Sequence, residues 1–223
     1  VADGQDKHAR ERGVVGALQH VWSSGFFYFL AAAVLIFVSG FRFRVGTDFS
    51  AYYFGYQSFI DDLPEKIRGL DEPGFAAIVW LGSLVFHDGL AATFTAALFT
   101  MGLAMLVIYR NSESLLFPTI LLVLIGFWHG SFNAVRQSLA AAVLFCGYKP
   151  LRDRDLKRYL AVVLVAFLVH RSALVMAFMY LAVHRKCSRG NLALTIGVTW
   201  LVRNSYEFVF NVAGAIMEAD YSQ

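Results

Sequence analysis

Apolar residues form long blocks separated by short polar segments, and this pattern predicts membrane-spanning helices. The blocks cover residues 21–40, 75–86, 90–109, 115–132, 134–148, 159–183 and 192–217. The longest reach the ~20 residues that a helix needs to cross the hydrocarbon core of a bilayer. No repeat or linker divides the chain. We therefore expect an all-α fold, a polytopic integral membrane helical bundle with broken or re-entrant helices that forms a single transmembrane domain over residues 1–223.

The first block is expected to be a retained helix rather than a cleaved signal. Val21–Gly40 is longer than the apolar core of a signal peptide, which has about 7–15 residues, and no convincing cleavage site follows it. The polar segment 1–19 carries Lys7, Arg10 and Arg12. Because basic flanks stay in the cytoplasm, we expect 1–19 to be a cytoplasmic tail.

The charges of the loops predict which side each loop occupies. The long polar stretch 41–74 has four basic and six acidic residues, whereas 149–158 has five basic and two acidic ones. By the positive-inside rule, 41–74 is an extracytoplasmic loop region and 149–158 a cytoplasmic basic loop. The block 75–86 rises only ~18 Å as a helix, too little to cross alone. We therefore expect 75–109 to make one broken crossing.

The block 159–183 is interrupted by His170-Arg171-Ser172, which leaves two interpretations. Two short helices that meet outside near His170 would keep the basic segment 184–190 inside. A single 25-residue crossing with His170 at mid-membrane is the alternative. The first topology brings 41–74, the turn at 129–136 and His170-Arg171 to one face, where their polar side chains would converge on one pocket.

Composition excludes several classes of protein. The chain has 58% hydrophobic and 16% charged residues and a mean hydropathy of +0.57, whereas a soluble domain has roughly 25% charged residues. A net charge of +3 is too small to indicate a nucleic-acid partner. The spacing of Cys146 and Cys187 matches neither a zinc site nor a disulfide framework. Asp153-Arg154-Asp155 is explained by solvated salt bridges, so we expect no metal and no cofactor.

Two basic positions inside apolar surroundings are candidates for chemistry. Arg136 precedes the apolar run 139–146, and an intramembrane arginine costs about 2.5–3.5 kcal/mol to insert. It is either an anion ligand, whose guanidinium matches phosphate oxygens, or an interfacial residue that snorkels to headgroups. His170 is either a proton shuttle or phosphate partner, or a hydrogen-bonding group within the bundle.

Two carboxylates in the 41–74 region have both a structural and a chemical interpretation. Asp48 follows Gly46-Thr47 and is a helix cap, a general base or a ligand of sugar hydroxyls. Tyr52 follows it, and a tyrosine can stack on a sugar ring. Glu72 precedes Pro73, a pattern typical of the start of a helix.

An ordered set of short motifs carries a family resemblance. The motifs are Arg42, Val45-Gly46-Thr47-Asp48-Phe49-Ser50-Ala51-Tyr52, Glu72-Pro73-Gly74-Phe75, Val135-Arg136-Gln137-Ser138-Leu139-Ala140 and His170-Arg171-Ser172-Ala173-Leu174. In this order, between hydrophobic segments, the set resembles the EpsG-like, Wzy-type family of bacterial polysaccharide polymerases.

The resemblance implies a metal-independent glycosyltransferase of the bacterial inner membrane. Such an enzyme moves a growing glycan from undecaprenyl diphosphate to the next lipid-linked oligosaccharide, at the outer face of the membrane. Its partners would be that oligosaccharide, membrane lipids, and chain-length regulator and flippase proteins of the same pathway. The residues that would carry this function are Asp48, Glu72 and His170 as catalytic groups, and Arg42, Arg44, Tyr52, Arg136 and Arg171 as groups that bind the substrate and its diphosphate.

A non-enzymatic function uses the same residues. A transporter or assembly subunit that binds a lipid-linked glycan also needs cationic side chains along the substrate path. A membrane acyltransferase that modifies polysaccharide is a third, weaker possibility. Only the polymerase would lengthen a lipid-linked repeat unit in liposomes.

Overall fold

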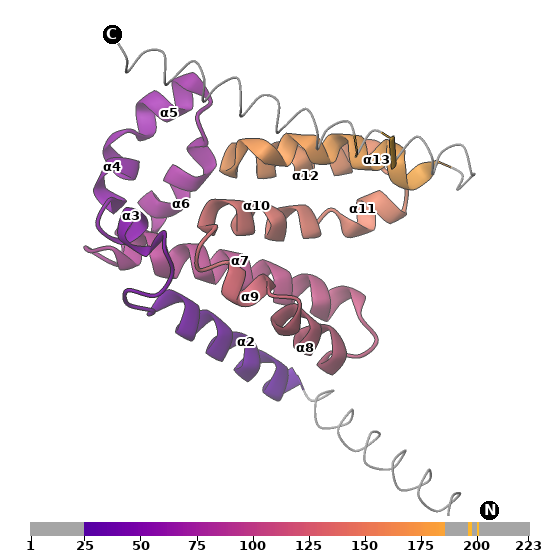
Figure 1. Cartoon of the computed structure of the whole chain (residues 1–223), viewed down its shortest axis with the longest axis horizontal. Coiled ribbons are helices and arrows are strands. Elements are labelled where there is room, and N and C mark those ends of the chain that lie inside the picture. Colours follow the sequence, from indigo (N-terminus) through magenta and orange to yellow (C-terminus); the bar gives the residue numbers. More distant parts are fainter. Residues whose placement is uncertain (1–24, 186–195, 198–199, 201–223) are drawn as a thin grey trace, which may run out of the picture. The chain divides into compact units, whose positions relative to one another are not determined.

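A computed structural model describes residues 25–185, 196–197 and 200, and all regular secondary structure in these residues is helical (Figure 1). The all-α expectation is thus confirmed for the described residues. The expected tail at 1–19 lies outside them, as does most of the block 192–217. The helices are α2 (Gly25–Gly40), α3 (Phe49–Tyr53), α4 (Tyr56–Asp61), α5 (Leu63–Gly69), α6 (Pro73–Ser83), α7 (Leu90–Asn111), α8 (Leu116–Leu124), α9 (Phe127–Gly130), α10 (Val135–Phe145), α11 (Tyr148–Arg152), α12 (Leu156–Val169), the 3₁₀-helix η1 (Arg171–Met176) and α13 (Ala177–His184).

The chain divides into two units, residues 1–180 and 181–223, and the features described below all lie in the first. Within it, α7 is the central helix, against which α2, α6 and α10 pack. Small side chains on α7, such as Ala92, Ala96 and Ala104, are fully buried and allow these helices to approach closely. One apolar core joins the first half of α7 to α3, α6, α10, α12 and η1, and a second joins its last half to α2 and α8.

Among the described helices, α7 alone is long and apolar enough to cross a membrane by length and composition, and 67% of its apolar 18-residue window is buried inside the protein. The helices α2, α6 and α10 are apolar but shorter. Membrane crossing by several helices therefore stays a prediction. Large apolar side chains are nevertheless exposed on the outer faces of several helices, including Phe26, Phe37, Phe117 and Leu164. Contiguous exposed apolar surface marks contact with a membrane or a partner.

Two predicted crossings are broken. The segment 75–109 divides into α6 and α7, and a Cβ on Gly82 would clash with the carbonyl oxygen of Ala91, so α6 folds back closely onto the start of α7. The apolar block 115–132 is interrupted as well. Helix α8 ends at Leu124, and Gly126 adopts a left-handed conformation (φ 88°) that L-residues with a side chain avoid.

The chain reverses direction at His170, which confirms the expectation of two short helices there. His170 is extended (φ −153°, ψ 123°) between α12 and η1. The hydroxyl of Tyr159 then donates to the carbonyl of Met176 at 2.7 Å, and that of Tyr180 to the carbonyl of Arg154 at 2.7 Å. These bonds hold the returning segment antiparallel to α12. The alternative of a single 25-residue helix is therefore wrong.

Candidate functional site

The carboxylate of Glu72 is the centre of a charged cluster drawn from three distant parts of the sequence. Its Oε2 accepts a hydrogen bond from Nη1 of Arg136 at 2.5 Å. Its Oε1 accepts one from Nδ1 of His170 at 2.6 Å and one from the backbone N–H of Arg171 at 3.1 Å. Both oxygens of one carboxylate are thus used to hold an arginine and a histidine beside each other.

The backbone of Glu72 is strained in a way that suits this role. Glu72 is the N-cap residue of α6 and has a left-handed conformation (φ 53°, ψ 45°), followed by Pro73 at the first helical position. Its side chain makes no capping bond to its own helix. A residue with a Cβ pays of order 1–3 kcal/mol to occupy such a region, and residues of this kind concentrate at functional sites. The carboxylate is turned away from α6 and toward α10 and α12.

Gly74 allows α6 to approach α12 closely enough for these bonds. A Cβ on Gly74 would lie 2.9 Å from the carbonyl oxygen of Leu168 and 3.1 Å from the backbone nitrogen of Val169. The first turn of α6 therefore packs directly on the backbone of the last turn of α12. His170 is the next residue along that backbone, so this contact sets the distance between His170 and Glu72.

Arg136 is held by two groups of the protein. It lies in the first turn of α10, and its Nε donates to the hydroxyl of Tyr52 at 3.1 Å while Nη1 donates to Glu72. Tyr52 is buried on α3, and the Arg136 guanidinium lies 6.0 Å from its ring centroid. The Arg136 side chain is 39% exposed, compared with 10% for Glu72. The Nη2 group makes no hydrogen bond to another described residue, so its two N–H donors are available to an anion.

The hydrogen bond to Glu72 defines how His170 can act. A carboxylate accepts hydrogen bonds, so Nδ1 of His170 carries the proton and donates it to Oε1. In the neutral ring, Nε2 is then an acceptor. A histidine oriented by a carboxylate through one ring nitrogen and free at the other is the arrangement in which histidine serves as a general base. The His170 side chain is 28% exposed, which leaves it accessible to a ligand.

The surroundings of Glu72 keep its carboxylate charged. Burial by itself raises the pKa of Glu72, but the N–H of Arg171, the charge of Arg136 and the bond from His170 together outweigh burial. The net result is a pKa below the ordinary value for glutamate. A carboxylate with a lowered pKa is a weak base, so this environment favours Glu72 as the group that positions Arg136 and His170.

A second polar group lies where the turn after α2 meets the turn before α10. The guanidinium of Arg42 donates to the carbonyl of Ser39 through Nη1 and to that of Phe132 through Nη2. Arg42 is buried, its Nε has no hydrogen-bond partner among the described residues, and it forms no ion pair with them. The backbone N–H of Thr47 donates to Oδ1 of Asn133 at 2.8 Å. These contacts hold the turn at 42–48 against the residues that lead into Arg136.

The remaining predicted residues lie outside the hydrogen-bonded cluster. Asp48 is the N-cap residue of α3 without a side-chain capping bond, and among the described residues its carboxylate accepts a hydrogen bond only from the Thr47 hydroxyl, at 3.4 Å. Arg44 is exposed and lies over the ring of Phe43. The Arg171 side chain pairs with Asp71 at 3.1 Å. The structure thus brings together Tyr52, Glu72, Arg136, His170 and the backbone of Arg171.

Three contributors were not identified as site residues from the sequence: Gly74, Asp71 and Asn133. Asp71 and Gly74 lie within two residues of Glu72 in the segment Asp71-Glu72-Pro73-Gly74, so their proximity to a charged position was a usable signal. Asn133 had no such signal, because its role depends on the distant Thr47. Among the described residues, no group of three or more His, Cys, Asp or Glu side chains is placed to hold a metal ion.

Comparison with known families identifies the chain. The model of the EpsG family matches residues 25–222, which include every member of the cluster. The protein belongs to the EpsG family. No curated protein and no solved structure matches it. Membership of the EpsG family implies a role in exopolysaccharide biosynthesis, and the charged cluster around Glu72 is the candidate site for that role in this EpsG protein.

Proposed function

We propose that this EpsG-family protein is a glycosyltransferase that polymerises undecaprenyl-diphosphate-linked oligosaccharide repeat units at the outer face of the bacterial inner membrane. The observation that carries the proposal is the Glu72 carboxylate, which holds a partly exposed arginine and a partly exposed histidine side by side. Transfer from a lipid diphosphate needs a cation for the leaving group and a base for the acceptor.

Each group has a defined part in the transfer. Nε2 of His170 accepts the proton of the acceptor hydroxyl, whose oxygen forms a new bond to the anomeric carbon of the donor glycan. The bond from that carbon to the diphosphate oxygen breaks, and its electron pair leaves with undecaprenyl diphosphate. The free N–H donors of Arg136 bind the negative charge that develops there. Glu72 is a positioning residue that fixes the orientation of both groups.

The other predicted residues serve substrate binding. Arg42 has no carboxylate partner among the described residues and supplies positive charge for the diphosphate. Arg44 and the Arg171 side chain extend the positive surface toward the anionic carrier, and Tyr52 fixes the guanidinium of Arg136. Asp48 stands as the second candidate base. In this mechanism arginine takes the part that a metal ion has in other transferases, so the reaction is metal-independent.

The proposal places the protein in the membrane as a multi-pass bundle. The long apolar helix α7, the shorter apolar helices around it and their exposed aromatic and aliphatic side chains support this placement. A lipid-linked donor has a carrier that stays in the bilayer, so the enzyme must bind the diphosphate from within or beside the hydrocarbon layer.

The test is elongation of a defined lipid-linked repeat unit by the full chain reconstituted in liposomes. We expect His170→Gln to lower the rate by about 10²–10⁴-fold, the usual contribution of a general base. His129→Gln, which alters an exposed histidine outside the cluster, should elongate normally. Glu72→Gln should lower the rate while Glu65→Gln, on exposed α5, should not. Elongation by His170→Gln at the wild-type rate would contradict the base assignment, and binding of the donor without elongation by wild type would favour a non-enzymatic subunit.

A further inference from the structure

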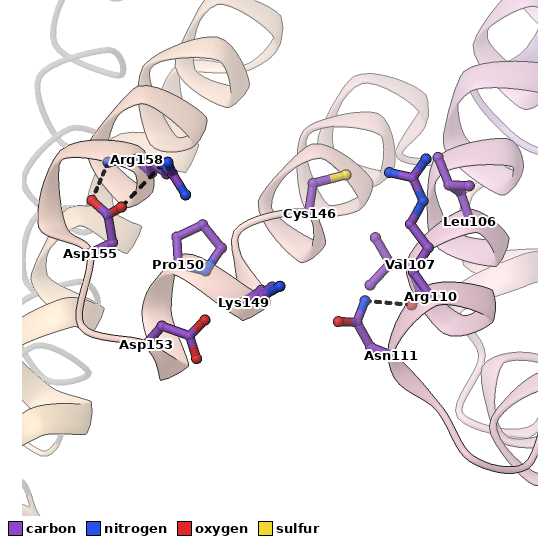
Figure 2. A pocket seen from close by; sticks show the side chains of 10 residues that line it. All are labelled: Leu106, Val107, Arg110, Asn111, Cys146, Lys149, Pro150, Asp153, Asp155 and Arg158. Carbon is purple, nitrogen blue, oxygen red and sulfur yellow. Dashed lines mark hydrogen bonds and ion pairs between the residues drawn. The ribbon is translucent and has the colours of Figure 1, made fainter.

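A cavity of about 580 Å³ lies at the ends of α10 and α12 that are remote from Glu72. It is bounded by the last turn of α7, the end of α10, α11 and the start of α12 (Figure 2). Arg136 opens α10 and Cys146 follows its last residue, so ten residues, or ~15 Å of helix, separate the candidate active site from this cavity. The cavity is therefore a separate site.

Most charges around the cavity are neutralised by one another. Asp155 forms an ion pair with Arg158 at 3.2 Å and caps α12 by accepting from the backbone N–H of Arg158. Asp153, which also lines the cavity, pairs with Arg152 at 3.1 Å. Both carboxylates of the lining are thus already matched by an arginine.

Two cations of the lining have no such partner. Neither Arg110 nor Lys149 forms an ion pair with a described residue. Figure 2 shows the Arg110 guanidinium facing the thiol of Cys146 across the space between α7 and α10, and Lys149 lies on the opposite side of that space from Arg110. The two come from segments about forty residues apart, and the fold brings both to one cavity. The lining thus has three basic and two acidic side chains, and the two cations without an ion pair to a described residue are Arg110 and Lys149.

The position of Arg110 indicates what kind of anion reaches the cavity. Arg110 lies in the last turn of α7, the 22-residue apolar helix that is long enough to cross a bilayer. An arginine at the end of such a helix lies at the level of the lipid headgroups. Basic pockets between helices on the cytoplasmic side bind the headgroups of anionic lipids. The five basic residues of 149–158 predict that this end faces the cytoplasm.

We propose that this cavity binds a phosphate-bearing anion, with the guanidinium of Arg110 and the ammonium of Lys149 as its two ligands. The phosphodiester of an anionic phospholipid and a free phosphate share this chemistry. Arg110 supplies planar paired donors to the phosphate oxygens, and Lys149 supplies a point charge. The site is independent of the proposed transferase activity, because none of its ligands belongs to the Glu72 cluster.

Cys146 provides a direct measurement of occupancy, since its thiol lines the cavity. In a Cys187→Ser background, we would follow alkylation of Cys146 by a small charged reagent in mixed micelles. Phosphatidylglycerol should slow alkylation by about tenfold at ten times its dissociation constant, because the free fraction falls as 1/(1 + [L]/Kd). Phosphatidylcholine, a zwitterion with no net charge, is the comparison lipid. Inorganic phosphate is tested separately, and protection by it alone would identify a free phosphate rather than a lipid as the ligand.

Matched variants separate the cavity from general positive charge. Lys149→Gln and Arg110→Gln should each abolish most of the protection, whereas Lys157→Gln, an exposed lysine outside the lining, should retain it. The quantity compared is the ratio of rates with and without the anion, so a change in the intrinsic reactivity of the thiol cancels. Lys149→Arg keeps the positive charge and should keep the protection. That result would show that position 149 tolerates substitution, so the loss in Lys149→Gln would not be a folding defect. Protection by neither anion, or equal protection in Lys149→Gln and Lys157→Gln, would overturn the proposal.

Discussion

The two ends of α10 and α12 use positive charge in different ways. At the Glu72 end, the guanidinium of Arg136 is fixed by a carboxylate and a tyrosine hydroxyl, and His170 is fixed by the same carboxylate. At the other end, Arg110 and Lys149 face a cavity without a carboxylate partner among the described residues. The first arrangement favours catalysis, because catalytic groups must be held in a defined position and orientation. The second favours the binding of an anion, because cations without a carboxylate partner attract negative charge.

The largest expected effect tests whether polymerisation depends on the hydrogen-bonding geometry of Arg136, near Glu72, and is unaffected by the same exchange at Arg110. Arg136→Lys keeps the charge, but an ammonium group lacks the planar guanidinium that contacts Tyr52, Glu72 and an anion at once. We therefore expect about a 10²-fold loss of polymerisation. Arg110→Lys should leave the polymer unchanged. The measurement is the chain-length distribution of the polymer from cells that express each variant at equal levels. Wild-type polymer from Arg136→Lys would show that Arg136 is an interfacial residue that snorkels.

The next effect concerns the contact that brings α6 to α12. Gly74→Ala places a methyl group against the backbone of Leu168 and Val169, and we expect it to destabilise the protein by about 1–3 kcal/mol, as overpacking does. Gly102→Ala is the matched control, because nothing lies within 4 Å of a Cβ at that helical position. Thermal unfolding in detergent measures both. Equal unfolding temperatures for the two variants would contradict the close approach of α6 and α12.

The smallest effect is the dependence of stability on pH. The pKa of Glu72 is lowered in the folded protein, so the unfolded chain binds more protons between the folded pKa and the ordinary value of about 4.3. The stability that the charged carboxylate contributes is complete above the ordinary pKa and is lost as the pH falls through the folded pKa. Wild type should therefore lose more stability on acidification than Glu72→Gln, which does not titrate. Glu65→Gln should follow wild type, and identical acid profiles for wild type and Glu72→Gln would remove the electrostatic role of Glu72.

Much of the architecture was predictable because it depends on local pattern. The polar interruption at His170 predicted a break between two short helices, and the structure reverses the chain there. The break at Gly126 was missed, because a glycine inside an apolar run is compatible with a continuous helix until its φ is known.

The site was predictable residue by residue but not as an arrangement. Arg136 and His170 stood out as charged groups beside apolar runs, and the family resemblance added Glu72. The local pattern around Glu72, with Pro73 next to it, indicated only the start of a helix. Its partners lie 64 and 98 residues away, and the contact of Gly74 with α12 decides their distance. No periodicity in the sequence reports such long-range contacts.

The pairing of Arg136 with Tyr52 and Glu72 has a consequence for the entropy of binding. A free arginine side chain carries about 2 kcal/mol of rotamer entropy, as does a lysine. Arg136 loses most of this freedom when the protein folds, so a substrate that meets it does not have to immobilise it again. Arg110 and Lys149 have no ion pair with a described residue, so in the proposed cavity site the anion has to order both side chains. The proposed ligand at the Glu72 end therefore meets a cation that is already oriented, whereas the proposed anion in the cavity has to order its own two cations.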